Sequence, residues 1–316
     1  MESTVTKITD RGTKENSARK YIRDLYYINN NSPFNNLTFL KNPQIVLDHI
    51  EQYRVTTQKN YLASVLSVLG TVENSKVYKP IIKRYNEILK EIESELETTN
   101  PKNVKTSSMK KNWIDWSQVI EKRDALMAKV DTFKNKKSAL DERKEYNRLI
   151  DLTVLSLYTY LPPRRNEFSE MSVVKNRKQI DREDWNYLIL DEKKFLINRF
   201  KTAGTHGSTE IDIPNELMNV LNIYLKHHPL LIGQKRAKYP VRFLVIGSGK
   251  AIPLNNGITR ILNRVFDRKI GSSMLRHIYL TSKYGDESNE REQDASAMGH
   301  STSTQAEYIM NKPDTD

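Results

Sequence analysis

The 316-residue sequence contains no cysteine. This absence excludes disulfides, thiolate zinc sites and a thiol nucleophile. Glycine and proline occur only 11 times each, which excludes collagen-like and Gly/Pro-rich low-complexity chains. No apolar run approaches the ~18 residues that a membrane-spanning helix needs, and residues 1–20 lack the apolar segment of a secretory signal. We therefore expect an intracellular protein outside the membrane, in the compartment that holds its partner.

Positive charge is in surplus, with 51 basic and 39 acidic side chains and a net charge of +12. The surplus is shared, because residues 1–110 carry +5 and residues 111–316 carry +7. A basic balance of this kind favours a polyanionic partner, of which a phosphate backbone is the usual one. A soluble protein that is merely basic is the alternative.

The first third of the chain predicts a small helical domain. Residues 1–35 are polar and end in an asparagine-rich stretch, which predicts a loose arm with one helix around 17–28. Apolar residues recur at helical spacing over 43–70, and a further helix is expected over 79–97. Residues 98–112 are polar and lack this periodicity, so we place a domain boundary there. The predicted domains are 1–110, an arm with a helical domain, and 111–316.

The second domain predicts helices interrupted by a small sheet. Three short segments rich in Ile, Leu, Phe and Tyr predict an antiparallel meander, at 186–190, 194–200 and 209–213. The remaining periodic segments predict helices, at 113–131, 138–160, 215–227, 254–267, 273–284, 290–298 and 304–310. The expected fold class is mainly α with a small antiparallel β-sheet.

Common catalytic and metal-binding motifs are missing. The sequence has no GxxxxGK[ST] phosphate loop, no HExxH, no GxSxG and no EF-hand loop. Its six histidines lack paired metal-ligand spacing. His227 and His228 point to different faces of a predicted helix, and we expect them at the surface. Neither a metal nor a cofactor is expected.

What remains is a set of basic side chains and one tyrosine in the second domain. They lie in the segments LPPRRNEFSEM, FLINRFKTAGTHGSTEIDIP, SSMLRHIYLTSKYG and AMGHSTSTQAEYIM. The set comprises Arg164, with Glu167 three residues on, then Lys201, Arg276, His300 and Tyr308. Thr304 and Glu307 have the spacing of a capping box, which predicts a helix that carries Tyr308 in its first turn.

This order of residues resembles the tyrosine recombinase (phage-integrase-like) family over residues 113–310. The resemblance implies a helical core-binding domain at 1–110, an α+β catalytic domain at 111–316, and a site-specific recombinase or integrase. Such enzymes cleave and rejoin double-stranded DNA through a 3′-phosphotyrosyl intermediate, as homotetramers on paired sites, without a cofactor or small-molecule substrate. The resemblance makes Tyr308 the nucleophile, gives Arg164, Lys201, Arg276 and His300 catalytic roles, and makes Glu167 a supporting residue.

These residue types suit the chemistry. Two arginine forks match the oxygens of a phosphoryl group and keep their charge. A lysine can protonate the leaving 5′-oxygen, and a phenol forms a reversible bond to phosphorus.

Two features depart from the pattern of the family. Ser273 stands where the family usually has a histidine, and a hydroxyl cannot act as an imidazole acid or base. Either His277 takes part of that role or the site works with one proton donor fewer. The step from His300 to Tyr308 is eight residues, one shorter than is common in bacterial members. Arg165 is the alternative to Arg164 as the first catalytic arginine.

Two alternative functions stay open, a type IB topoisomerase and a DNA-binding relative with an impaired site.

Overall fold

The computed structural model describes residues 2–73, 75–99, 104–137, 139–200, 203, 207–233 and 238–297, with side chains up to residue 292. The chain divides into two compact units, Met1–Thr106 and Ser107–Asp316. The division falls inside the polar segment 98–112, which lacks the apolar periodicity of its neighbours. Each unit has its own hydrophobic core.

The first unit is helical throughout its described residues. Helix α4 packs against both α2 and α5, and its buried face supplies Leu62, Val65 and Leu69 to the core. The helices are α1 (Glu2–Thr9), α2 (Glu15–Ile28), α3 (Pro43–Ile50), α4 (Val55–Leu69) and α5 (Lys79–Thr99).

The prediction of a loose arm at the N-terminus is wrong. Residues 2–9 form α1, which packs against α2. Val5 and Ile8 are three residues apart and therefore share one helix face, and both are buried. This two-residue apolar stripe is too short to stand out from the polar sequence around it.

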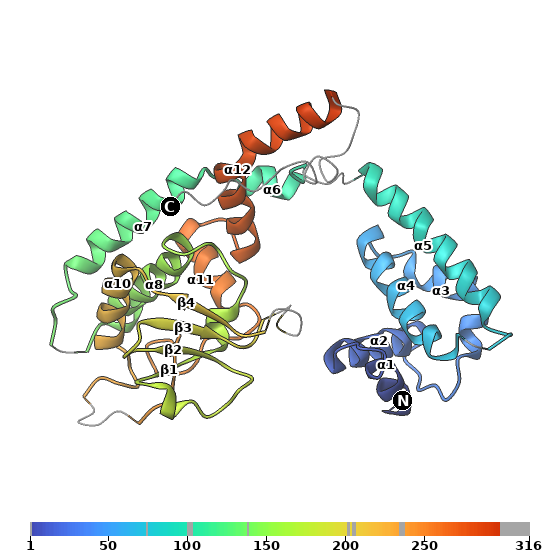
Figure 1. The fold of residues 1–316 in the computed structure, drawn as a ribbon, viewed down its shortest axis with the longest axis horizontal. Helices are drawn as coiled ribbons and strands as arrows, with labels where there is room; N and C mark the ends of the chain where they lie inside the picture. Colours follow the sequence, from blue (N-terminus) through green and yellow to red (C-terminus); the bar gives the residue numbers. More distant parts are fainter. Residues whose placement is uncertain are drawn as a thin grey trace, which may run out of the picture. The chain divides into compact units, whose positions relative to one another are not determined.

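Helix α8 is the centre of the second unit. Every residue from Leu149 to Tyr158 is buried, because α7, α10 and α11 pack against this one helix and the sheet covers it as well (Figure 1). It ends at Thr159, ahead of Pro162 and Pro163, which cannot continue a helix. The helices are α6 (Ser107–Asn112), α7 (Trp116–Asp131), α8 (Asn147–Thr159), α10 (Asn215–Lys226), α11 (Gly257–Phe266) and α12 (Ser272–Ala297).

The sheet has five strands in the order β4-β3-β2-β1-β5. The predicted antiparallel meander is confirmed as β2–β3–β4, but β1 pairs parallel to β2 and the whole sheet is mixed. The sequence prediction did not include β1 or β5, and β5 has only two residues, which its pairing with β1 defines. The strands are β1 (Met171–Val174), β2 (Asn186–Ile189), β3 (Lys194–Ile197), β4 (Thr209–Asp212) and β5 (Val241–Arg242).

The two faces of the sheet bury different clusters. Leu188 and Phe195 are cross-strand partners and belong to the main core with α8. Their neighbours along the strands point to the opposite face, as strand geometry requires. There, Val174, Trp185 and Tyr187 form a separate small cluster.

Helix α12 is continuous where the sequence predicts two helices, 273–284 and 290–298. The intervening residues 285–289 are polar and include Gly285, but they hold no proline that would break the helix. The predicted helix 304–310 lies outside the described residues. Among the helices described here, none is long and apolar enough to cross a membrane.

Candidate active site

Two neighbouring arginines in the segment that follows α8 differ in burial. Arg164 is half-buried, whereas Arg165 is exposed. Glu167 begins η4 (Glu167–Glu170), which is one turn of 3₁₀ helix, and Glu167 is only 8% exposed. The burial of Arg164 and Glu167 therefore agrees with the choice of Arg164 over Arg165 as the arginine that faces inward.

The charges of three predicted residues, Arg164, Glu167 and Arg276, act on the hydroxyl group of Tyr158. Tyr158 lies in the last turn of α8, and its hydroxyl donates to the backbone carbonyl of Arg165. Burial raises the pKa of Tyr158, and the charge of Glu167 raises this pKa further. A hydrogen bond with Ser272 and the charges of Arg276 and Arg164 lower the same pKa. Arg276 on α12 thus acts on the same hydroxyl as Arg164 and Glu167.

Two atoms at this point have no partner among the described residues. They are Nε of Arg164 and Oε2 of Glu167, and both are buried. A buried polar atom without a hydrogen bond is costly, so native proteins retain few of them. The guanidinium of Arg164 also lies over the ring of Phe200, 5.7 Å from its centroid. Arg164 is therefore held against the segment that leads to Lys201 and keeps an N–H available.

A pocket of about 460 Å³ lies at the start of α12. Ser273 and His277 are one helical turn apart, both are exposed, and both line it. Asn166 lines it too, accepting a hydrogen bond from Ser272 over 3.2 Å and donating one to the carbonyl of Asn255 over 3.2 Å. An imidazole therefore shares a pocket with the serine that replaces the usual histidine.

The described site contains part of the predicted set. The charges of Arg164, Glu167 and Arg276 all act on the pKa of Tyr158, while Ser273 and His277 line one pocket. The predicted residues Lys201, His300 and Tyr308 lie outside the described residues.

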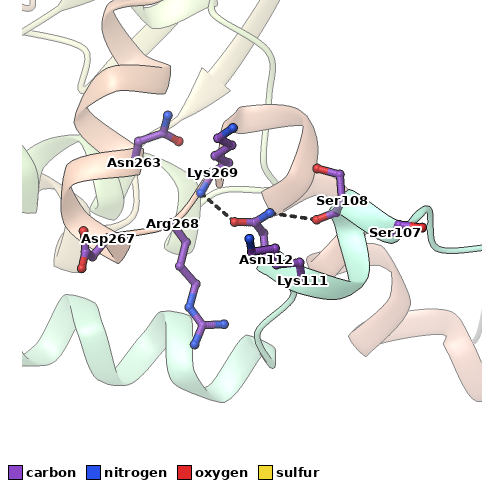
Figure 2. A pocket seen from close by; sticks show the side chains of 8 residues that line it. All are labelled: Ser107, Ser108, Lys111, Asn112, Asn263, Asp267, Arg268 and Lys269. Atoms are coloured by element: carbon purple, nitrogen blue, oxygen red, sulfur yellow. Dashed lines mark hydrogen bonds between the residues drawn. The ribbon is translucent and has the colours of Figure 1, made fainter.

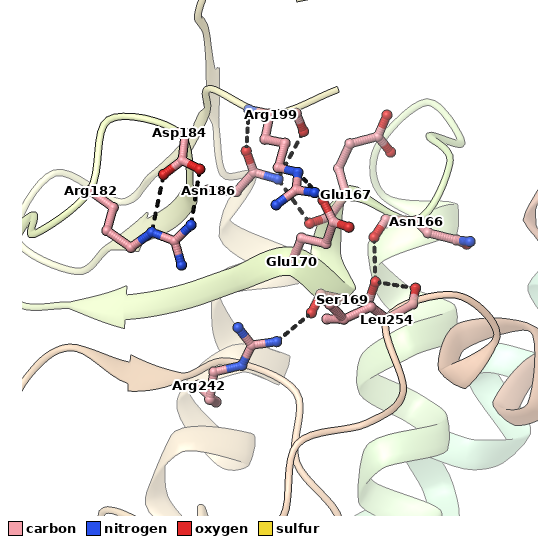
Figure 3. A network of polar contacts seen from close by, with 10 residues as sticks. All are labelled: Asn166, Glu167, Ser169, Glu170, Arg182, Asp184, Asn186, Arg199, Arg242 and Leu254. Atoms are coloured by element: carbon pink, nitrogen blue, oxygen red, sulfur yellow. Dashed lines mark hydrogen bonds and ion pairs between the residues drawn. The ribbon is translucent and has the colours of Figure 1, made fainter. Parts of the chain in front are cut away.

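The sequence analysis missed Asn186, which is fully buried at the start of β2. Its Nδ2 donates to the carbonyls of Glu167 and Arg199, each over 3.1 Å, and its Oδ1 accepts from the N–H of Arg199 over 2.7 Å (Figure 3). An amide at the first position of an otherwise apolar strand is the only sequence signal for this role. Through Asn186, the turn that carries Glu167 is tied to the end of the β2–β3 hairpin.

A second pocket, of about 790 Å³, lies between α6 and the loop that joins α11 to α12 (Figure 2). Asn112 holds its wall together, accepting from the N–H of Lys269 over 2.9 Å and donating to the carbonyl of Ser108 over 2.8 Å. Arg268 points away from Lys269, and its Nη1 donates to the carbonyl of Trp113 over 3.3 Å. The basic side chains of this pocket diverge, so they do not form one anion site.

The expectation that His227 and His228 lie at the surface is wrong. Both are buried after the last turn of α10, where His228 contacts the segment that contains β5 and His227 contacts the segment that follows α7. His228 Nε2 lies 3.0 Å from the carbonyl oxygen of Arg242, and Nε2 of His227 lies 3.0 Å from that of Lys134. These histidines satisfy backbone carbonyls of the core.

Among the described residues, no three His, Asp or Glu side chains gather in a group that could hold a metal ion. No protein-family model matches the chain, and no similar curated protein or solved structure is found. The resemblance to tyrosine recombinases therefore depends on the motif residues themselves and on the geometry of those described above.

Proposed function

We propose that this protein is a site-specific DNA recombinase or integrase that cleaves and rejoins strands through a 3′-phosphotyrosyl intermediate. One observation carries the proposal. Arg164 and Arg276 come from distant segments, yet the charges of both lower the pKa of one buried hydroxyl, that of Tyr158. Two arginines at one point, with a buried N–H left over, make a site for an oxyanion with several oxygens.

The arginines would stabilise the phosphoryl group during strand cleavage. Arg164 and Arg276 would donate to its non-bridging oxygens, whose charge grows in the transition state. Glu167 would orient Arg164, and Asn186 would hold the turn that carries Glu167. Removing one preorganised donor from such a site typically costs about 2.7–4 kcal/mol of transition-state stabilisation.

The resemblance supplies the remaining roles of the proposal. Tyr308 would attack the phosphorus atom, Lys201 would protonate the leaving 5′-oxygen, and His300 would hydrogen-bond the phosphate. The unit Met1–Thr106 would act as the core-binding domain, and the subunits would pair as a homotetramer on double-stranded DNA.

A covalent trap tests this proposal without knowledge of the target. The purified protein is incubated with nicked duplexes of randomised sequence, and SDS-stable protein–DNA adducts are isolated and sequenced. We expect an adduct whose DNA-linked peptide contains Tyr308. Tyr308→Phe should lose the adduct and still bind DNA, whereas an equal adduct yield from this variant would remove Tyr308 as the nucleophile.

Ser273 favours a second candidate, a DNA-binding relative with an impaired site. Ser273 and His277 both line the pocket at the start of α12. The hydroxyl of Ser273 cannot act as the acid or base that a histidine at position 273 would supply. Tight DNA binding without any adduct from the wild type would support this candidate. Once the target is known, plasmid relaxation without exchange between paired sites would instead indicate a type IB topoisomerase.

A further inference from the structure

Three guanidinium groups surround a single indole on the outer face of the sheet. The Cζ atoms of Arg242, Arg182 and Arg199 lie 4.6, 4.8 and 5.8 Å from the ring centroid of Trp185. We call Arg182, Arg199 and Arg242 the arginine triad. Trp185 is only 6% exposed, and its indole N–H donates to the hydroxyl of Ser172 over 3.1 Å. The indole is thus a fixed platform that brings three cations together.

Carboxylates balance two of the three charges. Arg182 pairs with Asp184 over 2.9 Å, and Arg199 pairs with Glu170 over 3.0 Å (Figure 3). Arg242 forms no ion pair with any described residue, and its Nη2 donates to the backbone carbonyl of Ser169 over 3.0 Å. The triad therefore carries one positive charge more than its carboxylates neutralise.

The unbalanced charge belongs to the most enclosed member. Burial lowers the pKa of Arg242, and the charge of Arg182 lowers it further, while Glu170 opposes this shift. The ordinary pKa of arginine is so high that Arg242 stays charged at any working pH. An anion bound beside Arg242 would offset this unbalanced charge.

The triad is joined to the candidate active site by short stretches of backbone. The turn η4 carries Glu167 of the site at one end and Glu170, the partner of Arg199, at the other. Asn186 binds the backbone of both Glu167 and Arg199. Arg199 also precedes Lys201 by two positions. The same backbone segments therefore carry residues of the triad and of the candidate active site.

We propose that the arginine triad binds a backbone phosphate of double-stranded DNA. This inference rests on the proposed function, because it takes the DNA held at the candidate active site as the source of the phosphate. Guanidinium forks match phosphate oxygens, and Arg242 is the triad member that no described carboxylate pairs with. The covered indole has no open face, so it cannot stack on an unpaired base, which argues against a single-stranded partner.

The salt dependence of DNA binding tests the assignment. Arg242→Gln removes the unbalanced charge, and its amide can still donate to the carbonyl of Ser169. The affinity for a labelled duplex is measured over a range of salt concentrations, in the Tyr308→Phe background so that no cleavage interferes. One lost phosphate contact should reduce the slope of log K against log salt by ~0.9. An unchanged slope in a folded Arg242→Gln protein would overturn the assignment.

Arg177→Gln is the matched control. Arg177 begins the 3₁₀ turn η5 (Arg177–Gln179), which follows β1 at the end of the strands away from Trp185, and Glu192 and Glu210 pair with it over 2.7 and 2.6 Å. Arg177 does not belong to the triad and would give the phosphate no donor, so its removal should leave the slope unchanged. Should Arg242→Gln lack a cooperative unfolding transition, Arg182→Gln tests the same site, because Arg182 is exposed and its loss should also lower the slope.

A second measurement separates DNA from a free anion. Inorganic phosphate is titrated while tryptophan fluorescence is recorded, because Trp185 lies under the triad. A response that Arg242→Gln abolishes, together with an unchanged DNA slope, would assign the triad to free phosphate and overturn the DNA assignment. Failure of the proposed function has a different signature. DNA binding with the expected change in slope but without any covalent adduct would leave the triad assignment intact and refute only the recombinase activity.

Discussion

Asn186 and Arg199 are joined by two reciprocal hydrogen bonds, from the N–H of Arg199 to Oδ1 over 2.7 Å and from Nδ2 to the carbonyl of Arg199 over 3.1 Å. The same Nδ2 also reaches the carbonyl of Glu167. One buried amide thereby fixes the end of the β2–β3 hairpin against the turn that carries Glu167. This relationship sets the geometry of both the candidate active site and the arginine triad.

Asn186→Ala should destabilise the second unit by about 2–3 kcal/mol, because it leaves buried backbone groups without partners. Urea unfolding followed by tryptophan fluorescence measures this, since Trp113, Trp116 and Trp185 all belong to this unit. Asn147→Ala is the control, because its side chain makes one exposed hydrogen bond and its loss should cost under ~0.5 kcal/mol. Equal losses for the two variants would contradict the role given to Asn186.

The sequence predicted much of the fold because apolar spacing is a local signal. The meander β2–β3–β4 and helices such as α4 and α10 lie where the periodicity indicated them. Strand β5 has two residues, and only its pairing with β1 defines it, so no local pattern could indicate it. The burial of His228 was missed for the same reason, since carbonyls far along the chain hold its ring.

The candidate site divides in a similar way. Arg164, Glu167 and Arg276 are predicted from motif order, which is readable along the chain. Tyr158, Asn186 and Trp185 have no motif, and their roles come from tertiary contacts. The three arginines around Trp185 come from the segment before it, from the end of the β2–β3 hairpin and from β5. Only the folded chain brings them together.

Tyr158→Phe tests whether the Tyr158 hydroxyl holds the segment that carries Arg164 in place. Loss of the hydroxyl removes its hydrogen bond to the carbonyl of Arg165 and loosens the segment that carries Arg164. Adduct formation in the trap should fall on the order of 100-fold, because small misplacements of catalytic groups have effects of this size. DNA affinity should change little. The measurement is the rate of adduct formation under single-turnover conditions.

Tyr85→Phe is the matched control for this variant. The hydroxyl of Tyr85 is buried and donates to the carbonyl of Leu40 over 3.0 Å, but it belongs to the first unit. Both variants should lose about 1 kcal/mol of stability, and only Tyr158→Phe should slow cleavage. Equal cleavage rates in the two variants would refute the special position of Tyr158.

Arg164 and Arg165 should differ sharply in function. Arg164→Gln removes the half-buried guanidinium and should slow adduct formation by about 100- to 1,000-fold. Arg165 is exposed, so Arg165→Gln should affect only DNA affinity, with a reduction of the salt slope of at most ~0.9. Adduct rates and binding isotherms for both variants separate these effects. A slow Arg165→Gln enzyme with a fast Arg164→Gln enzyme would reverse the assignment.

His228 should make the second unit less stable in acid. Its Nδ1 accepts the N–H of Leu230 over 3.2 Å and its Nε2 faces the carbonyls of Arg242 and Phe243, so the ring is held neutral beside Tyr224. Burial lowers the pKa of His228. Because the unfolded chain then binds the proton more tightly, the stabilisation is complete above about pH 6.5 and is lost as the pH falls toward the lower folded pKa.

The pH dependence of unfolding by urea, followed by tryptophan fluorescence, measures this effect. His228 contributes a slope of at most ~1.4 kcal/mol per pH unit, and His228→Gln should remove that contribution while lowering stability at neutral pH. His49→Gln removes a histidine of the first unit and is the control for the substitution itself. His228 contacts the backbone carbonyl of Arg242, which belongs to the arginine triad. His228→Gln should therefore also weaken DNA binding. An identical loss of stability in acid for wild type and His228→Gln would show that other groups govern this transition.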